Sequence, residues 1–231
     1  MNRASILIVL GCCLLGGVSQ ARGGWSVAEA AFLRGDYDQA LHDWQLLAEQ
    51  GDARARYNLG LLFFNGWGVA QDNAVAEQWF RLAAEQDDAR ASYALGYLYQ
   101  HGYGQQRDTS QAVDWFTRAA GKGLAEAQFS LGVMYREGSA GLAQDDYQAA
   151  EWFRQAAEQG LAEAQLGLGY LYDTGRGVPQ DHVEALRWYR AAAGQGNARA
   201  RLNLGLIYKA ARDYPESVRW FRVAAKQGYP K

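Results

Sequence analysis

The sequence predicts an all-α fold, a solenoid of about six stacked antiparallel helix pairs. Two motifs that alternate along the chain carry this prediction. A Leu-Gly pair recurs five times at spacings of 36 or 37 residues, and an aromatic pair that begins with Trp follows each copy. Because both motifs stay in step over five copies, the chain is an array of one repeated unit. The Leu-Gly pairs begin at Leu59, Leu95, Leu131, Leu168 and Leu204, and the aromatic pairs at Trp79, Trp115, Trp152, Trp188 and Trp220.

The segment that precedes the array, residues 1–21, is typical of a secretory signal peptide. Arg3 is followed by an apolar stretch that is too short to span a bilayer comfortably, and the segment ends in small residues at Ala21. We expect cleavage after Ala21 and a soluble, exported, periplasmic protein without cysteine, because Cys12 and Cys13 are lost. The alternative is a lipoprotein that is anchored through Cys12.

The first helix of each repeat is predicted by the motif Ala-x-x-x-Leu-Gly-x-x-aromatic. Its four defined positions fall on one face of a helix. A glycine inside a helix costs about 1 kcal/mol relative to alanine, so five such glycines indicate a packing requirement. The copies run from Ala55, Ala91, Ala127, Ala164 and Ala200 to Phe63, Tyr99, Tyr135, Tyr172 and Tyr208.

The second helix carries the motif small-x-x-Trp-aromatic-x-x-Ala-Ala, which forms another apolar stripe. An Asp seven residues before the Trp is the predicted N-cap, and Gln or Glu follows at capping-box spacing in most copies. A glycine in the left-handed conformation is expected to end these helices, with Asp87 as the exception. The caps are Asp72, Asp108, Asp145, Asp181 and Asp213, the capping-box residues are Gln111, Gln148, Glu184 and Glu216, and the glycines are Gly51, Gly123, Gly160, Gly196 and Gly228.

Glycine-bearing loops join the two helices in the four central units, as in residues 65–72 and 174–181. The first and last units have shorter connections, at residues 35–37 and 210–214, as expected for units that cap an array. The predicted organisation is a helix pair at 22–51, four repeats at 52–87, 88–123, 124–160 and 161–196, and a capping repeat at 197–231.

Composition and side-chain chemistry argue against several functions. The chain has 23 Lys+Arg and 25 Asp+Glu, a balance that does not favour nucleic acid as a partner. Its three histidines, His42, His101 and His182, lie in different units without metal-ligand spacing. No nucleophile motif is present, so we expect neither a cofactor nor catalysis.

The repeat as a whole resembles the Sel-one-like repeat (SLR) family, and the short-looped terminal units resemble the related tetratricopeptide repeat. The resemblance rests on Ala-x-x-x-Leu-Gly-x-x-Tyr, Gly-x-Gly-Val-x-Gln-Asp and Ala-x-x-Trp-Phe-x-x-Ala-Ala-x-x-Gly. It implies a right-handed α/α superhelix with a concave inner face and an adaptor that holds other proteins or peptides. Family members with a disulfide in each repeat are known, and this chain departs from them.

The resemblance also implies which first-helix positions line the concave face. One set is charged: Arg54, Arg90, Glu126, Glu163 and Arg199. The other set is aromatic: Tyr57, Tyr93, Tyr97 and Tyr170. The aromatic positions either broaden the packing stripe or form a binding groove, where a tyrosine hydroxyl suits a half-exposed surface. The order of the charges favours a partner segment of opposite charge order.

The long loops provide a second candidate surface, because Trp67 and Tyr103 occupy equivalent loop positions that Arg176 takes in a later unit. Either these side chains pack onto their own helix pair or they mark a partner site. The predicted function is a non-catalytic adaptor in the cell envelope that binds a protein or peptide. Two alternatives remain: an enzyme that acts on cell-wall material or a β-lactam, and a lipid-anchored assembly factor at the outer membrane.

Overall fold

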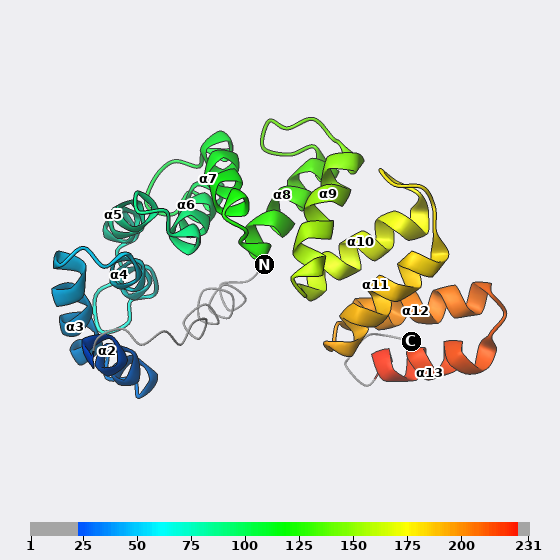
Figure 1. Ribbon diagram of the computed structural model, residues 1–231, viewed down its shortest axis with the longest axis horizontal. Coiled ribbons are helices and arrows are strands. Elements are labelled where there is room, and N and C mark those ends of the chain that lie inside the picture. Colours follow the sequence, from blue (N-terminus) through cyan, green and yellow to red (C-terminus); the bar gives the residue numbers. More distant parts are fainter. Residues whose placement is uncertain (1–22, 226–231) are drawn as a thin grey trace. The chain divides into compact units, whose positions relative to one another are not determined.

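The structure is a computed structural model that describes residues 23–225, and within this range it contains twelve helices and no strand (Figure 1). The helices follow one another as six antiparallel pairs, which confirms the predicted all-α fold. The proposed signal peptide, Cys12 and Gly228 lie outside the described residues. The pairs are α2 (Gly23–Leu33) with α3 (Tyr37–Glu49), α4 (Ala53–Asn65) with α5 (Asn73–Ala84), α6 (Ala89–His101) with α7 (Thr109–Gly121), α8 (Ala125–Glu137) with α9 (Asp146–Glu158), α10 (Ala162–Thr174) with α11 (His182–Gly194), and α12 (Ala198–Ala210) with α13 (Tyr214–Ala225).

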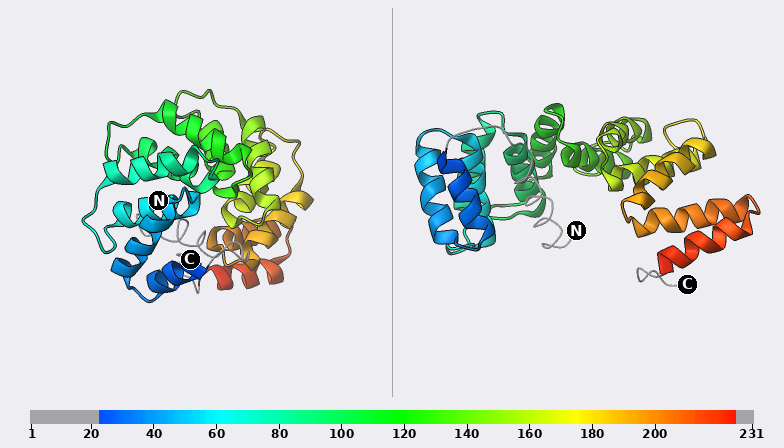
Figure 2. Two further views of the ribbon diagram at one scale, coloured as in Figure 1. Left: turned by 60° about the vertical axis from the view of Figure 1, so that its left-hand side comes forward. Right: turned by 60° about the horizontal axis from the view of Figure 1, so that its bottom comes forward.

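The chain divides into two compact units, one that ends at Leu124 and one that begins at Ala125. Unit 1 contains α2 to α7 and unit 2 contains α8 to α13. Within each unit, the second helix of one pair packs against the first helix of the next pair (Figure 2). Each unit is therefore a stack of three helix pairs.

The second helices begin at the predicted aspartates. The Asp72 carboxylate accepts hydrogen bonds from the backbone N–H groups of Ala74 and Val75 at 2.9 and 3.0 Å. The backbone N–H of Asp72 donates to the carbonyl of Phe63 at 3.0 Å, so it is not available to a side chain of α5. The same arrangement recurs at Asp108, Asp145 and Asp181, whose N–H groups donate to Tyr99, Tyr135 and Tyr172. The last residue of each first-helix motif thus fixes the start of the second helix.

Asp87 occupies the helix end where the other repeats have glycine. Its φ of 64° is in the left-handed region, as are the φ angles of 88°, 94° and 92° at Gly123, Gly160 and Gly196. The carboxylate of Asp87 forms ion pairs with Lys122 at 3.0 Å and Arg118 at 3.3 Å. These hydrogen bonds, first from Lys122 and then from Arg118, lower the pKa of Asp87. The exception in the sequence pattern is therefore compensated by contacts with α7.

The glycine of each Leu-Gly pair makes room for an aromatic ring. A Cβ atom at Gly60 would lie 2.5 Å from the ring of Phe80 in α5, and one at Gly96 would lie 2.8 Å from Phe116 in α7. The same relation holds for Gly132 with Phe153, Gly169 with Tyr189, and Gly205 with Phe221. The predicted packing requirement is confirmed: the second aromatic residue of each pair packs directly on the backbone of the first helix.

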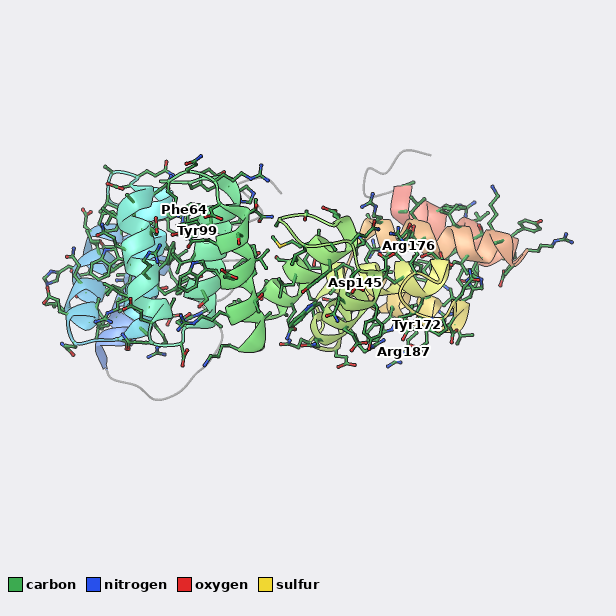
Figure 3. The ribbon with its side chains drawn as sticks, turned by 90° about the horizontal axis from the view of Figure 1, so that it is seen from above. Phe64, Tyr99, Asp145, Tyr172, Arg176 and Arg187 are labelled. Carbon is green, nitrogen blue, oxygen red and sulfur yellow. The ribbon has the colours of Figure 1, made fainter. Side chains whose placement is uncertain are left out.

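Successive repeats are also joined by polar side chains. Arg154 in α9 donates to the hydroxyl of Tyr172 in α10 at 3.4 Å, and Arg81 in α5 donates to that of Tyr99 in α6. Figure 3 labels both tyrosines. The tyrosine that ends a first-helix motif therefore connects its own repeat to the one before it.

Three of the long loops also contact the preceding helix pair. The second glycine of the loop packs on the start of the second helix in the preceding pair: Gly68 on Tyr37, Gly104 on Asn73, and Gly177 on the backbone of Asp146. All three glycines have positive φ angles, between 69° and 80°. The short connection between α12 and α13 lacks this glycine loop.

Candidate functional site

The four tyrosines predicted to line a groove lie in two different environments. Tyr57, Tyr93 and Tyr97 in unit 1 are buried, with exposed fractions of 0%, 6% and 5%. The rings of Tyr57 and Tyr93 lie 5.7 and 5.3 Å from those of Phe80 and Phe116. Of the two alternatives, these three tyrosines therefore follow the first, a broader packing stripe, and not a half-exposed groove. Tyr170 in unit 2 differs, because 38% of its surface is exposed.

The predicted charged positions also differ between the units. In unit 1, Arg54 and Arg90 form ion pairs with Asp52 and Asp88, the N-caps of their own helices, at 3.8 and 2.7 Å. The guanidinium of Arg90 also lies over the ring of Tyr57, 4.7 Å from its centroid. Binding of a partner by these arginines stays a prediction, and their charge is already partly compensated.

In unit 2, Glu126 and Glu163 lie in the first turns of α8 and α10. The helix α10 begins after Leu161, whose side chain makes no capping hydrogen bond. A carboxylate in the first turn stabilises the positive end of the helix dipole. The two glutamates thus have a structural role whether or not they also contact a partner.

The loop side chains pack between repeats. The ring of Trp67 lies 5.2 Å from Phe32 and 6.0 Å from Tyr37 in the preceding helix pair. It packs against a core cluster that also includes Leu59 and Leu62 of its own pair. Tyr103 contacts both its own and the preceding repeat, with ring distances of 5.8 Å to Tyr97 and 5.8 Å to Phe64. This loop position therefore joins neighbouring repeats, and its role in binding a partner stays a prediction.

Arg176 takes the same loop position in unit 2 and forms a bidentate ion pair with Asp146. Its Nε and Nη2 atoms donate to the two carboxylate oxygens at 2.9 and 3.2 Å. This hydrogen bond, together with one to Tyr170, raises the pKa of Arg176. The guanidinium is therefore held in a fixed orientation by the start of α9.

A pocket of about 460 Å³ opens in unit 2 between the first helices α8, α10 and α12 and the loop after α10. Its volume is in the range of ligand-binding pockets. Of the candidates named from the sequence, it brings together Glu163, Tyr170, Arg176 and Arg199. The lining residues are Phe129, Arg136, Glu163, Leu166, Gly167, Tyr170, Arg176, Arg199 and Asn203.

The pocket has an excess of positive charge, because three arginines face one glutamate. Arg136 forms an ion pair with Glu137 at 3.0 Å, and Arg176 forms one with Asp146. Within the described part of the chain, Arg199 has no hydrogen-bond or ion-pair partner. Phe129, Leu166 and Tyr170 supply apolar surface between these charges. The arrangement suits a ligand with an apolar side chain and negative charge.

Within residues 23–225, no three His, Cys, Asp or Glu side chains lie close enough to hold a metal ion. None of the helices in this range has the length and apolar character that a membrane span requires.

Comparison with known proteins identifies the repeat. The family model of the Sel1 repeat matches five consecutive segments, residues 53–88, 89–124, 125–161, 162–197 and 198–229. The chain belongs to the Sel1 repeat family. The fifth Sel1 match covers α12 and α13, the pair with the short connection.

Two solved structures support this assignment. The protective antigen c5321 of uropathogenic Escherichia coli, which displays an SLR fold, is 41% identical with a TM-score of 0.79. That alignment covers 81% of this chain but only 41% of the antigen, so this chain spans less than half of that relative. A Sel1 repeat protein from Oxalobacter formigenes is 31% identical with a TM-score of 0.81, over 88% of this chain and 85% of that protein. No match was found among curated proteins. Sel1 repeat proteins are generally scaffolds for protein interactions, without catalysis.

Proposed function

We propose that this protein is a non-catalytic adaptor of the cell envelope that binds a protein or peptide partner through the pocket of unit 2. The observation that carries the proposal is the pocket itself, in which an exposed tyrosine and an arginine without a partner lie together. Tyrosine and arginine are enriched among the residues that dominate binding energy at protein interfaces. The first helices that form the pocket hold these side chains on rigid elements.

The proposed location in the envelope rests on residues 1–21, whose charge and hydrophobicity are typical of a signal peptide. Mass spectrometry of the N-terminus of the protein purified from cells tests this location. A chain that starts at Arg22 supports an exported soluble protein, and a lipidated Cys12 supports the anchored alternative. An intact N-terminus on Met1 in the whole population contradicts export.

Binding through the pocket is tested by cross-linking and affinity capture from cells. The wild type is compared with a Tyr170→Ala/Arg199→Gln variant and with the control Arg187→Gln. Arg187 is an exposed residue of α11 that pairs with Glu184 outside the pocket. We expect a defined partner with the wild type and the control, and its loss with the double variant. Circular dichroism checks that all three proteins are equally helical. Equal capture by all three would contradict binding at this pocket.

A further inference from the structure

Assuming the proposed function, we propose that the pocket of unit 2 selects an extended peptide segment in which an acidic residue lies next to a large apolar residue, with Arg199 as the main contact for the carboxylate. The proposal names the chemistry of the partner, which the family assignment leaves open. It rests on which charged side chains of the pocket already have an ion-pair partner. These side chains are Arg136, Glu163, Arg176 and Arg199.

Arg199 differs from the arginines at the same position of other repeats. Arg54 and Arg90 each pair with an aspartate that caps their own helix. In α12 the N-cap is Asn197, whose neutral side chain accepts a hydrogen bond from the N–H of Ala200 at 3.0 Å. The charge of Arg199 is therefore not balanced by the N-cap of its own helix. It lies at the positive end of the helix dipole, a position that disfavours a cation. A carboxylate from a ligand removes this local conflict.

The other two arginines of the pocket provide a second point of positive charge. Arg176 is held by both oxygens of Asp146, so its planar guanidinium is oriented before a ligand arrives. Arg136 lies over the ring of Phe153, 5.9 Å from its centroid, and its partner Glu137 is 54% exposed. Such an exposed ion pair contributes little free energy. Arg136 can therefore exchange Glu137 for a ligand carboxylate with little loss of free energy.

The apolar part of the pocket lies on the same helices. Phe129 and Leu166 occupy equivalent positions of α8 and α10, and Tyr170 lies one helical turn after Leu166. One large apolar side chain of a peptide can cover this surface and bury the exposed ring of Tyr170.

Glu163 limits how acidic the partner can be. It lies at the position of α10 that corresponds to Arg199 in α12, and it has no ion-pair partner within the described part of the chain. A continuous run of acidic residues would place a carboxylate beside it, which is unfavourable. We therefore expect one or two acidic residues beside an apolar residue, and not a polyacidic segment.

Selection from a phage-displayed library of random nine-residue peptides on the purified full chain tests the proposal. We expect selected peptides to combine Asp or Glu with a neighbouring Leu, Phe, Tyr or Trp. Fluorescence anisotropy of one selected, labelled peptide then gives the affinity. Arg199→Gln should weaken binding about tenfold or more, because a hydrogen bond to a charged group is lost. The control Arg187→Gln should leave the affinity unchanged.

Three outcomes would overturn the inference. They are selection of basic peptides, selection of no peptide at all, and acidic peptides that bind Arg199→Gln as tightly as the wild type. The inference and the proposed function can fail separately. If cellular capture depends on the pocket but selected peptides carry no acidic preference, the adaptor function stands and the acidic specificity is wrong. If cellular capture fails as well, the adaptor function itself is wrong.

Discussion

Asn58 and Asn203 occupy the same first-helix position, and their neighbours explain why the residue there is polar. The equivalent Gly167 lies against Phe153 of the preceding second helix, where a Cβ would be 3.1 Å from the ring. In the same way, Asn203 lies near the hydroxyl of Tyr189, which takes the place of Phe153 one repeat later. Asn58 follows the first helix pair, where this aromatic is Trp44. Asparagine thus coincides with a preceding aromatic that has a polar group, although Asn58 and Trp44 form no hydrogen bond with each other.

Replacing Asn203 should therefore destabilise the protein through Tyr189. The Tyr189 side chain is fully buried, and its hydroxyl has no partner within hydrogen-bond distance among the described residues. Asn203→Leu removes a nearby amide dipole, so we expect it to lower the free energy of unfolding by about 1 kcal/mol. In a Tyr189→Phe background the same substitution should cost much less. Urea denaturation of the two single variants and the double variant measures the coupling. Additive effects would show that the two side chains do not interact.

The same tyrosine predicts how stability responds to alkaline pH. Burial raises the pKa of Tyr189 well above its ordinary value of 10, an effect that the amide of Asn203 opposes. A raised pKa in the folded state contributes stability below pH 10, and this contribution is lost as the pH rises above 10 towards the folded value. The free energy of unfolding of the wild type should therefore decrease relative to that of Tyr189→Phe between pH 10 and 11.5. A difference that stays constant over this range would contradict the assignment.

At the scale of single helices, the position of a glycine decides the effect of an alanine. Gly96 lies in α6 against Phe116, and a Cβ there would be 2.8 Å from the ring. Gly121 in α7 has no atom within 4 Å of the same hypothetical Cβ. Alanine gains about 1 kcal/mol of helix propensity at either site. At Gly96 this gain is exceeded by an overpacking cost of about 1 to 3 kcal/mol.

Gly96→Ala should therefore lower the free energy of unfolding, whereas Gly121→Ala should raise it by up to about 1 kcal/mol. Chemical denaturation followed by circular dichroism measures both with one method. The Gly121 variant serves as the control for the helix propensity of alanine. Equal and positive effects at the two sites would contradict close packing of Phe116 on the first helix.

The different environments of Tyr97 and Tyr170 show how a loop residue can determine whether a helix position is exposed. Both tyrosines occupy the same position of their first helices. The loop residue Tyr103 packs against Tyr97, whereas its equivalent, Arg176, is drawn to the carboxylate of Asp146. Tyr170 therefore lacks an aromatic cover and remains 38% exposed. The pocket of unit 2 thus lies where the loop carries a charged residue in place of an aromatic one.

At the scale of the whole molecule, the repeat pattern predicted the fold because each motif position has one local role. The aspartate caps, the Leu-Gly pairs and the aromatic pairs act within one helix pair, so their spacing was sufficient. The candidate site depended on contacts between repeats, so the sequence left open whether the tyrosines pack or line a groove, and the structure buries three of the four. Arg199 was among the predicted concave-face positions, and one further signal sets it apart: Asn197 replaces the aspartate that precedes Arg54 and Arg90 by two residues.

Stability should also be local, because each helix pair within a unit packs mainly on its neighbours in the stack. In such arrays the free energy is approximately a sum of terms for single repeats and for adjacent interfaces. We expect Gly96→Ala to increase hydrogen exchange in α6 and α7, and in α5, which packs on α6. Exchange in α10 to α13 should be unchanged, because these helices belong to the other compact unit.

Hydrogen–deuterium exchange with mass spectrometry on the wild type and Gly96→Ala measures this spread. In the wild type, α12 and α13 should exchange fastest within unit 2, because this end pair has several exposed apolar side chains, Leu206, Tyr214 and Val218. The Gly121→Ala variant, which should slow exchange in the same region of unit 1, is the matched control. A uniform change along the whole chain in either variant would mean that both units unfold in one cooperative step, and nearest-neighbour packing would then be the wrong description of this array.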